Sequence, residues 1–114
     1  MKKYEFTGET KTVSFLFKDV TLHRIQAITS FASVVAGELG GWIEKEENLS
    51  HKGDAWVYSN AKVYGNAEVR GNAEVYGNAV VRGKAVVRGK AEVREKAVVR
   101  GKAVELAKLQ ILTD

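Results

Sequence analysis

The chain of 114 residues contains no cysteine and no proline, and it has only two histidines. Without cysteine, neither disulfide bonds nor thiolate metal sites can stabilise it, which suits a reducing compartment. Two histidines do not supply a three-histidine zinc site, so we expect no metal and no cofactor. The sequence has no run of the roughly 20 apolar residues that a membrane span needs, and no apolar segment follows its basic start. We therefore expect a soluble, cytoplasmic protein that does not bind membranes.

What the chain does contain is a six-residue repeat. An alanine occurs at every sixth position from Ala55 to Ala103, and eight of these alanines are followed two residues later by a valine. Residues two apart in an extended strand point to the same side, so each repeat places two apolar side chains on one face. A glycine followed by Asn or Lys often comes next, and this pair suits a turn. The pattern predicts an all-β fold, a parallel β-helix.

The repeat also predicts which side chains fill the bore of the solenoid. If three repeats close one triangular coil, residues 18 apart in the sequence stack on one another, about 4.8 Å apart. Glu105 takes the ninth inward position, where we expect the last coil to open to water. The predicted columns are Val57, Val75, Val93 and Ile111; Val63, Val81 and Val99; and Val69 and Val87.

Residues 1–38 lack the repeat, and we expect them to form a small β-rich cap at the N-terminal end of the solenoid. Two β-prone stretches, Thr12–Phe17 and Val20–Ile28, are separated by two charged residues and indicate a strand pair. A helix over residues 21–36 is the alternative. Trp42, which follows the cap, is expected to plug the end of the bore.

An irregular first coil is predicted for residues 39–54, followed by the regular β-helix over 55–114. Counting back in steps of six assigns Ile43 and Leu49 to the alanine position of this first coil. His51 then falls at the valine position. Irregular terminal repeats are typical of solenoids, because the ends must be capped.

The residues beside each inward valine point outward and form three different faces. Valines rimmed by arginines have the composition of a protein interface, although strand propensity alone also explains such valines. One further face carries aromatic side chains. The candidate interaction residues are Val80, Arg82, Val86, Arg88, Arg94, Val98, Arg100 and Val104, with Trp56, Tyr58 and Tyr76 on the aromatic face.

Two kinds of partner follow from these faces. The outward valines of two adjacent faces converge on a shared corner, so we expect a homotrimer. From Arg82 to Lys108 there are nine lysines and arginines but three glutamates, against a net charge of +4 for the whole chain. This positive half indicates an anionic partner, an acidic protein or a nucleic acid, and the alternative is a set of solvated corners that prevents aggregation.

Catalysis has little support in the residues. His51 and His23 are the two possible general bases, but no second group is spaced to orient either of them. We therefore assign no catalytic residue and expect both histidines to be structural.

Several motifs accompany the repeats. They are Tyr4-Glu5-Phe6-Thr7-Gly8, Leu22-His23-Arg24-Ile25, Leu39-Gly40-Gly41-Trp42-Ile43-Glu44 and Asn48-Leu49-Ser50, with the Ala-x-Val-Tyr-Gly-Asn repeats. Together they resemble the small hexapeptide-repeat proteins of bacteriophages and prophages. The resemblance implies a left-handed triangular solenoid of phage origin, in a family of unknown function. Hexapeptide acyltransferases are a more distant likeness, and they are typically trimers with an extruded loop and a catalytic histidine. No such loop is evident between Ala55 and Ala103.

Our leading hypothesis from the sequence is a non-enzymatic scaffold that binds itself and a host protein or nucleoprotein, for example to inhibit a defence complex. An acyltransferase that uses His51 or His23 is the first alternative. Sequence-independent nucleic-acid binding through the Arg and Lys columns is the second.

Overall fold

The computed structural model describes residues 2–100 and the backbone of Glu105 and Leu106. This part of the chain is built from strands and one short 3-10 turn, with two long strands first and very short ones after them. The strands are β1 (Tyr4–Phe15), β2 (Lys18–Ala27), β3 (Leu39–Ile43), β4 (Trp56–Val57), β5 (Lys62–Val63), β6 (Glu68–Val69), β7 (Glu74–Val75), β8 (Val80–Val81), β9 (Val86–Val87), β10 (Glu92–Val93), β11 (Val98–Val99) and β12 (Glu105–Leu106), and the 3-10 turn is η1 (Glu46–Asn48).

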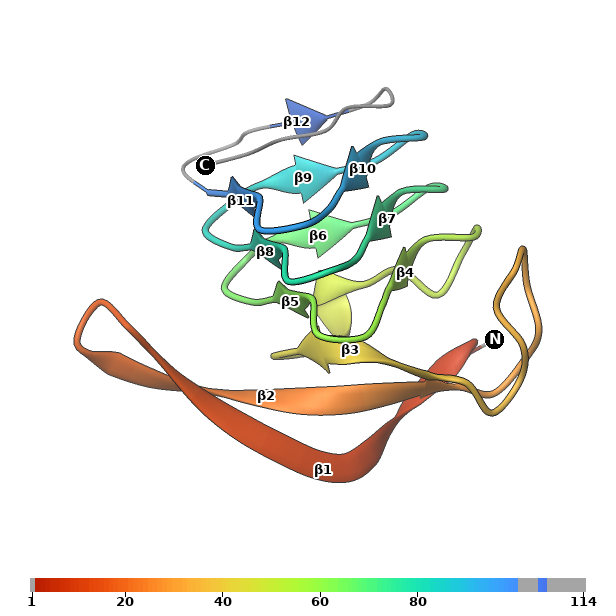
Figure 1. Ribbon diagram of the computed structural model, residues 1–114, viewed down its shortest axis with the longest axis horizontal. Helices are drawn as coiled ribbons and strands as arrows, with labels where there is room; N and C mark the ends of the chain where they lie inside the picture. The colour runs from red at the N-terminus through yellow and green to blue at the C-terminus, as the bar shows by residue number, and fades with distance from the viewer. Residues whose placement is uncertain (1, 101–104, 107–114) are drawn as a thin grey trace.

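The short strands stack in parallel into the three sheets of a β-solenoid (Figure 1). One sheet runs β3-β5-β8-β11, the second β4-β7-β10 and the third β6-β9-β12. Each coil forms backbone hydrogen bonds to the next, as from Tyr58 N to Val75 O at 2.7 Å and from Lys62 N to Ala79 O at 3.0 Å. This arrangement confirms the predicted parallel solenoid and is consistent with left-handed winding.

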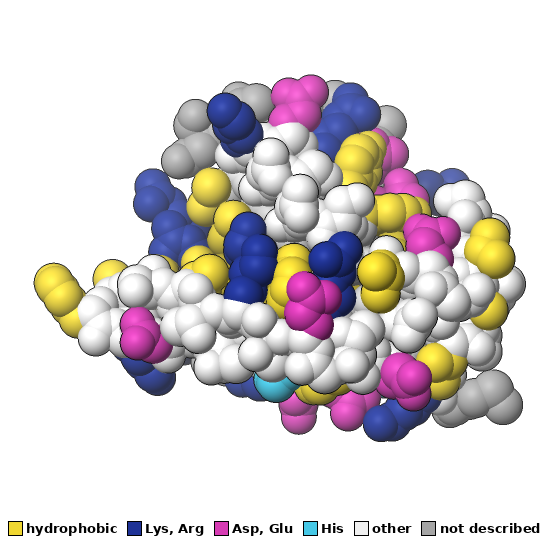
Figure 2. All heavy atoms as spheres, turned by 60° about the horizontal axis from the view of Figure 1, so that its bottom comes forward, with side chains coloured by type: hydrophobic (Ala, Val, Ile, Leu, Met, Phe, Trp, Pro, Cys, Tyr) yellow, Lys and Arg dark blue, Asp and Glu magenta, His cyan; other side chains and the backbone are white. Residues whose placement is uncertain are grey.

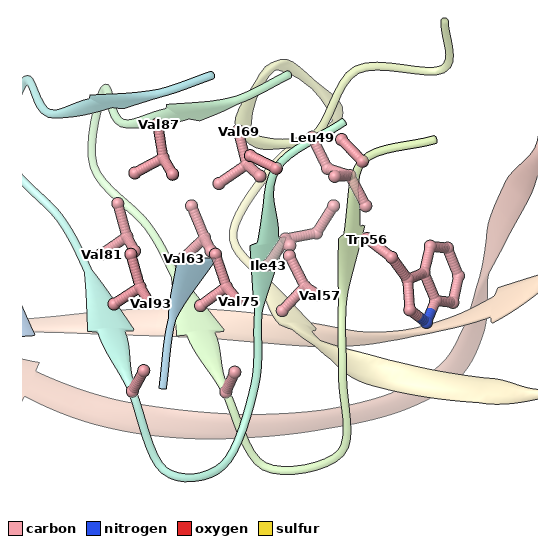
Figure 3. Close-up of a cluster of buried hydrophobic side chains, with 14 of the residues drawn as sticks. Ile43, Leu49, Trp56, Val57, Val63, Val69, Val75, Val81, Val87 and Val93 are labelled. Atoms are coloured by element: carbon pink, nitrogen blue, oxygen red, sulfur yellow. The ribbon is translucent and has the colours of Figure 1, made fainter. Parts of the chain in front are cut away.

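The valine columns of the bore are also confirmed. Val57 pairs with Val75 and Val75 with Val93, whereas Val63 pairs with Val81 and Val69 with Val87. These side chains are fully buried and point toward one another inside the coils (Figure 3). Their alanine neighbours are equally buried, and the small side chain lets the three sheets approach at the corners.

At the far end of the solenoid, the predicted register is wrong by one residue. β12 pairs Glu105 with Val86 and Leu106 with Val87, so Glu105 does not lie opposite the inward valine. Ile111, the last member of a predicted column, lies outside the described residues.

The first coil is longer than the others by two residues. Ile43 pairs with Val63 and Leu49 bridges to Val69, a separation of 20 residues instead of 18. Both side chains therefore continue the valine columns, and their predicted alanine positions are wrong. The regular spacing begins again at Gly53, which stacks on Gly71 so closely that a Cβ added to Gly53 would lie 2.5 Å from the Gly71 carbonyl oxygen. His51, in the extra turn, does not enter the bore.

The N-terminal residues form the predicted strand pair and no helix. β1 and β2 make an antiparallel hairpin, with a bulge between Phe6 and Thr10. Its turn consists of Leu16 and Phe17, not of the charged pair that follows. The hairpin crosses the N-terminal end of the solenoid (Figure 1), where buried Tyr4 and Ile25 join the core cluster and close the bore.

The hairpin also enlarges one face of the solenoid. β2 pairs with β3, and β3 pairs with β5, so that β1-β2-β3-β5-β8-β11 is one continuous six-stranded sheet. Within the described residues, no helix is long and apolar enough to cross a membrane.

Candidate binding surfaces

The outer side of the six-stranded sheet carries an aromatic cluster that sequence periodicity did not reveal. Trp42 is 3% exposed and belongs to a cluster with Val20, Leu22 and Tyr64, and Val80 packs against this cluster. Trp42 pairs with Lys62, an outward position, so its predicted role as a plug of the bore is wrong. The neighbour in the same strand, Ile43, takes the inward position instead. The hairpin supplies Val20 and Leu22 of this cluster, and the solenoid supplies Tyr64.

Basic side chains lie directly over these rings. The Lys11 ammonium lies 4.4 Å from the centroid of the Trp42 ring, and the Arg24 guanidinium lies 5.2 Å from it. Arg82 lies 4.5 Å from the centroid of Phe15. Cations held over aromatic faces gain electrostatic attraction from the ring and remain in place at the surface.

A fourth cation, Lys62, belongs to the same surface. Burial lowers the pKa of Lys62, and the positive charge of Lys11 lowers it further. Two like charges thus face each other here, which creates a positive potential that an anion would relieve. In the view from the hairpin side, basic side chains lie beside hydrophobic ones across the middle of the molecule, and an acidic side chain lies next to them (Figure 2). We call Lys11, Arg24, Lys62 and Arg82 the cationic face.

The predicted valine and arginine sites are only partly brought together. Val80 points outward as expected, but it packs against the aromatic cluster. Val86 and Val98 are half-buried on separate sheets, and Val104 lies outside the described residues. Arg88 is half-buried and Arg100 is exposed. Of the predicted arginines, Arg82 is the one that we include in the cationic face, because it lies over Phe15.

The predicted aromatic face is wrong at its first position. Trp56 has no exposed surface, because Tyr4 and Phe31 pack edge-on against its ring at centroid distances of 6.2 and 5.3 Å. The repeat places position 56 outward, but residues 28–38 fold over it. Only the long-range packing of the cap, which has no periodicity, decides this burial.

Tyr58 and Tyr76 do form an aromatic column, and it is paired with carboxylates. The hydroxyl of Tyr58 donates to Glu74 at 3.0 Å, and the hydroxyl of Tyr76 donates to Glu92 at 2.8 Å. Their rings meet edge to face at 5.7 Å. Burial, together with the nearby carboxylates of Glu74 and Glu38, raises the pKa of Tyr58 to about 12, although a hydrogen bond to Ser33 lowers it.

Arg94 is part of this column instead of a basic patch. Its Nη1 donates to the Tyr76 hydroxyl at 3.3 Å and lies 3.8 Å from a Glu92 carboxylate oxygen. The charge of Arg94 is therefore largely balanced by its own face. The column stabilises the coils, and the 18-residue stacking of the sequence already assigns Tyr76, Glu92 and Arg94 to one outward face.

His51, the first candidate for a general base, has both ring nitrogens engaged. The backbone N–H of Lys3 donates to Nδ1 at 3.1 Å, and Nε2 lies 2.8 Å from the Glu46 carboxylate. Because Nδ1 is an acceptor, Nε2 carries the proton and donates to Glu46. The ring also stacks on Tyr4 at 4.0 Å. With its one lone pair occupied, His51 cannot take a proton from a substrate in this arrangement.

His23 lies on the hairpin, stacked on Phe6 with a centroid distance of 4.5 Å. It neighbours Arg24 in β2 but points to the other side of the sheet from the cationic face, because alternate residues of a strand point to opposite sides. Within the described residues, no group of three His, Asp or Glu side chains could hold a metal ion.

Comparison with known proteins places these features in context. No family model matches the chain. It is similar to YdcK of Escherichia coli (strain K12), a protein named as an uncharacterized acetyltransferase, with 39% identity over 62 residues. The match covers 51% of this chain and 19% of the relative, so the chain spans about a fifth of that protein's length. Over the matched residues, the chain is thus similar in sequence to an acetyltransferase-like hexapeptide-repeat protein, and its own stacked coils fit a hexapeptide-repeat family.

Proposed function

We propose that the chain is a binding module, in which the cationic face holds an acidic surface of a protein partner. The observation that carries this proposal is the set of cations over the aromatic cluster. Among them, Lys11 is close enough to Lys62 to lower the pKa of Lys62. Such charges are costly to gather without a counter-charge, and a carboxylate-rich partner supplies one.

The aromatic rings of the cationic face are covered, and this favours a protein partner over a nucleic acid. Proteins that bind single strands stack bases on open aromatic faces. Here Trp42 is buried, and the cations Lys11 and Arg24 lie over its ring. Phe15 is likewise covered by Arg82. The surface therefore offers charge and hydrogen-bond donors instead of stacking platforms.

Acyl transfer is the second candidate, and the comparison supports it more than it supports the first. A relative named as an acetyltransferase matches half of this chain. The hydrogen bonds of His51 argue against this residue as the base within one chain. Acyl transfer would need a different arrangement of His51, His23 as the base, or a group from a second copy.

One experiment separates these candidates. A poly-glutamate peptide, a DNA duplex and acetyl coenzyme A are titrated into the protein by calorimetry. A triple substitution, Lys11→Glu, Lys62→Glu and Arg82→Glu, is compared with a matched control, Arg70→Glu, Lys90→Glu and Lys96→Glu, whose basic side chains are exposed elsewhere on the solenoid. Both variants change the net charge equally.

We expect poly-glutamate binding that the first variant loses and the control largely keeps. Equal losses in both variants would contradict the proposal, because they would indicate attraction by net charge alone. Tighter binding of DNA than of poly-glutamate, with a steep salt dependence, would favour nucleic acid. Binding of acetyl coenzyme A with measurable acetyl transfer would favour the second candidate.

The remaining sequence-based expectations stay proposals. They are phage origin, a host protein or nucleoprotein as the partner, and a homotrimer formed through the outward valines. The packing of Val80 against the aromatic cluster leaves less of its side chain for a trimer interface.

A further inference from the structure

The tip of the β1-β2 hairpin is the most exposed apolar feature in the described residues. Leu16 and Phe17 are 76% and 110% exposed, and both have a positive φ, 52° and 62°. A two-residue turn with both φ angles positive normally contains Asn and Gly, because larger side chains crowd the backbone there. Two bulky apolar residues are thus held in a strained turn with their side chains in water.

Neither folding nor solubility explains this choice of residues. Asn and Gly would make a better turn, and polar side chains would cost less at the surface. Strained backbone that the fold does not require is concentrated at sites that bind. Hydrophobic side chains protrude at the end of the hairpin (Figure 2), well beyond the body of the solenoid.

Directly behind the tip lies a pocket of about 360 Å³. Its apolar lining comes from Phe15, Leu16, Val20 and Tyr64, and Tyr64 meets Phe15 edge to face at 5.7 Å. The pocket is large enough for a phenylalanine side chain. Phe17 of the same chain does not line this pocket, and its side chain is fully exposed to solvent.

We propose that a second copy of this chain occupies the pocket, with each copy inserting Phe17 into the pocket of the other. A protruding group and its receiving pocket lie side by side on one chain, which is the arrangement that a two-fold interface requires. One rotation then fills both pockets at once.

The charges at the pocket rim fit the same two-fold arrangement. Lys18, next to Phe17 at the tip, lines the pocket together with Glu44 and Lys45. The Lys45 ammonium donates to Asn66 Oδ1 of its own chain at 2.9 Å. Glu44 uses Oε1 to accept a hydrogen bond from Gly65 N at 2.8 Å, which fixes its carboxylate at the rim. Lys18 of one copy can therefore approach Glu44 of the second copy, and the reverse pair forms by symmetry.

The test is the oligomeric state of the full chain over a concentration series up to millimolar, measured by analytical ultracentrifugation. The variant Leu16→Asn combined with Phe17→Gly restores the preferred turn and removes the apolar tip. We expect the wild type to be a dimer at the upper concentrations, and the variant to bind itself at least about tenfold more weakly. The melting temperature of the variant should be equal or higher, because its turn is unstrained.

A second measurement does not depend on how the variant folds. A photo-reactive phenylalanine analogue at position 17 is cross-linked in a mixture of isotope-labelled and unlabelled protein. We expect mixed-isotope cross-links to the residues around Glu44 or Tyr64. A wild type that stays monomeric, a trimer, an unchanged dimer in the variant, or cross-links only within one chain would each overturn the proposal. These outcomes are independent of the poly-glutamate titration, because the tip variant leaves the cationic face intact.

Discussion

At the scale of single residues, two neighbours in β9 face opposite environments. Val87 is fully buried in the bore, whereas Val86 is half-buried on the outer side. We expect Val87→Asp to lower the free energy of unfolding by more than about 4 kcal/mol, because a charge would be buried without a partner. Val86→Asp should cost less than about 1 kcal/mol. Urea denaturation measures both, and similar losses would mean that the inward and outward assignment is wrong.

Lys3 gives a second prediction at this scale. Its side chain is 5% exposed, and Nζ donates to the carbonyl oxygens of Gly53 and Ala55 at 3.1 and 2.6 Å. Burial lowers the pKa of Lys3 from 10.5 to about 8, an effect that the attraction of Asp54 only partly offsets.

Between these two pKa values, the unfolded chain binds a proton that the folded chain has lost. The contribution of Lys3 to stability therefore rises with pH from about 8 to 10.5 and is smallest below pH 8. The unfolding free energy of the wild type minus that of Lys3→Met should therefore become more positive as the pH rises over this range. A difference that is flat or falls with pH would contradict the account.

At the scale of elements, one corner of the solenoid departs from the glycine pattern. Ser59 and Glu95 have φ angles of 49° and 62° at positions where other coils use glycine, such as Gly77 with 72°. Glu95→Gly should raise the free energy of unfolding by up to about 1 kcal/mol, because a left-handed residue without a Cβ is unstrained.

The matched control is Gly71→Ala. Gly71 has a φ of 68°, and an added Cβ would lie 2.9 Å from the backbone nitrogen of Gly89. This substitution should destabilise the protein by more than about 1 kcal/mol. Thermal and urea unfolding test the pair, and a loss of stability in Glu95→Gly would show that its side chain compensates for the strain.

The repeat could be read from the sequence because each coil obeys the same local rule. The period of six fixes the inward valines and the corner glycines without reference to the rest of the chain. The first coil could not be placed this way, because Ile43 and Leu49 are apolar residues that suit either inward column. Only the extra turn before Gly53 reveals which column they join.

The candidate site was harder to predict because it lies where the repeat meets the hairpin. Arg82 was identified from the repeat, but its aromatic partner Phe15 comes from β1. Lys11 and Trp42 are far apart in sequence and become neighbours only through the β1-β2-β3 pairing. A repeat in the sequence does not predict contacts between residues that lie far apart in the chain. The burial of Trp56 by Tyr4 and Phe31 is a contact of this kind, so the repeat did not predict it.

At the scale of the whole molecule, the two sides of the hairpin have different roles. Its inner side closes the N-terminal end of the bore through Tyr4 and Ile25, and its outer side completes the cationic face. The polar and charged side chains on this outer surface thus rest on a continuous set of backbone hydrogen bonds from the cap to the solenoid. A rigid face of this kind suits the binding of a preformed partner surface.

The most direct test of the binding proposal is an amide chemical-shift map of the full chain during titration with poly-glutamate. We expect the largest shifts in β1, β2, β5 and β8 around Lys11, Arg24, Lys62 and Arg82, with small shifts at the corner residues Lys90 and Lys96. Shifts that are centred on those corners, or an absence of shifts at saturating peptide, would contradict the assignment of the cationic face as the binding surface.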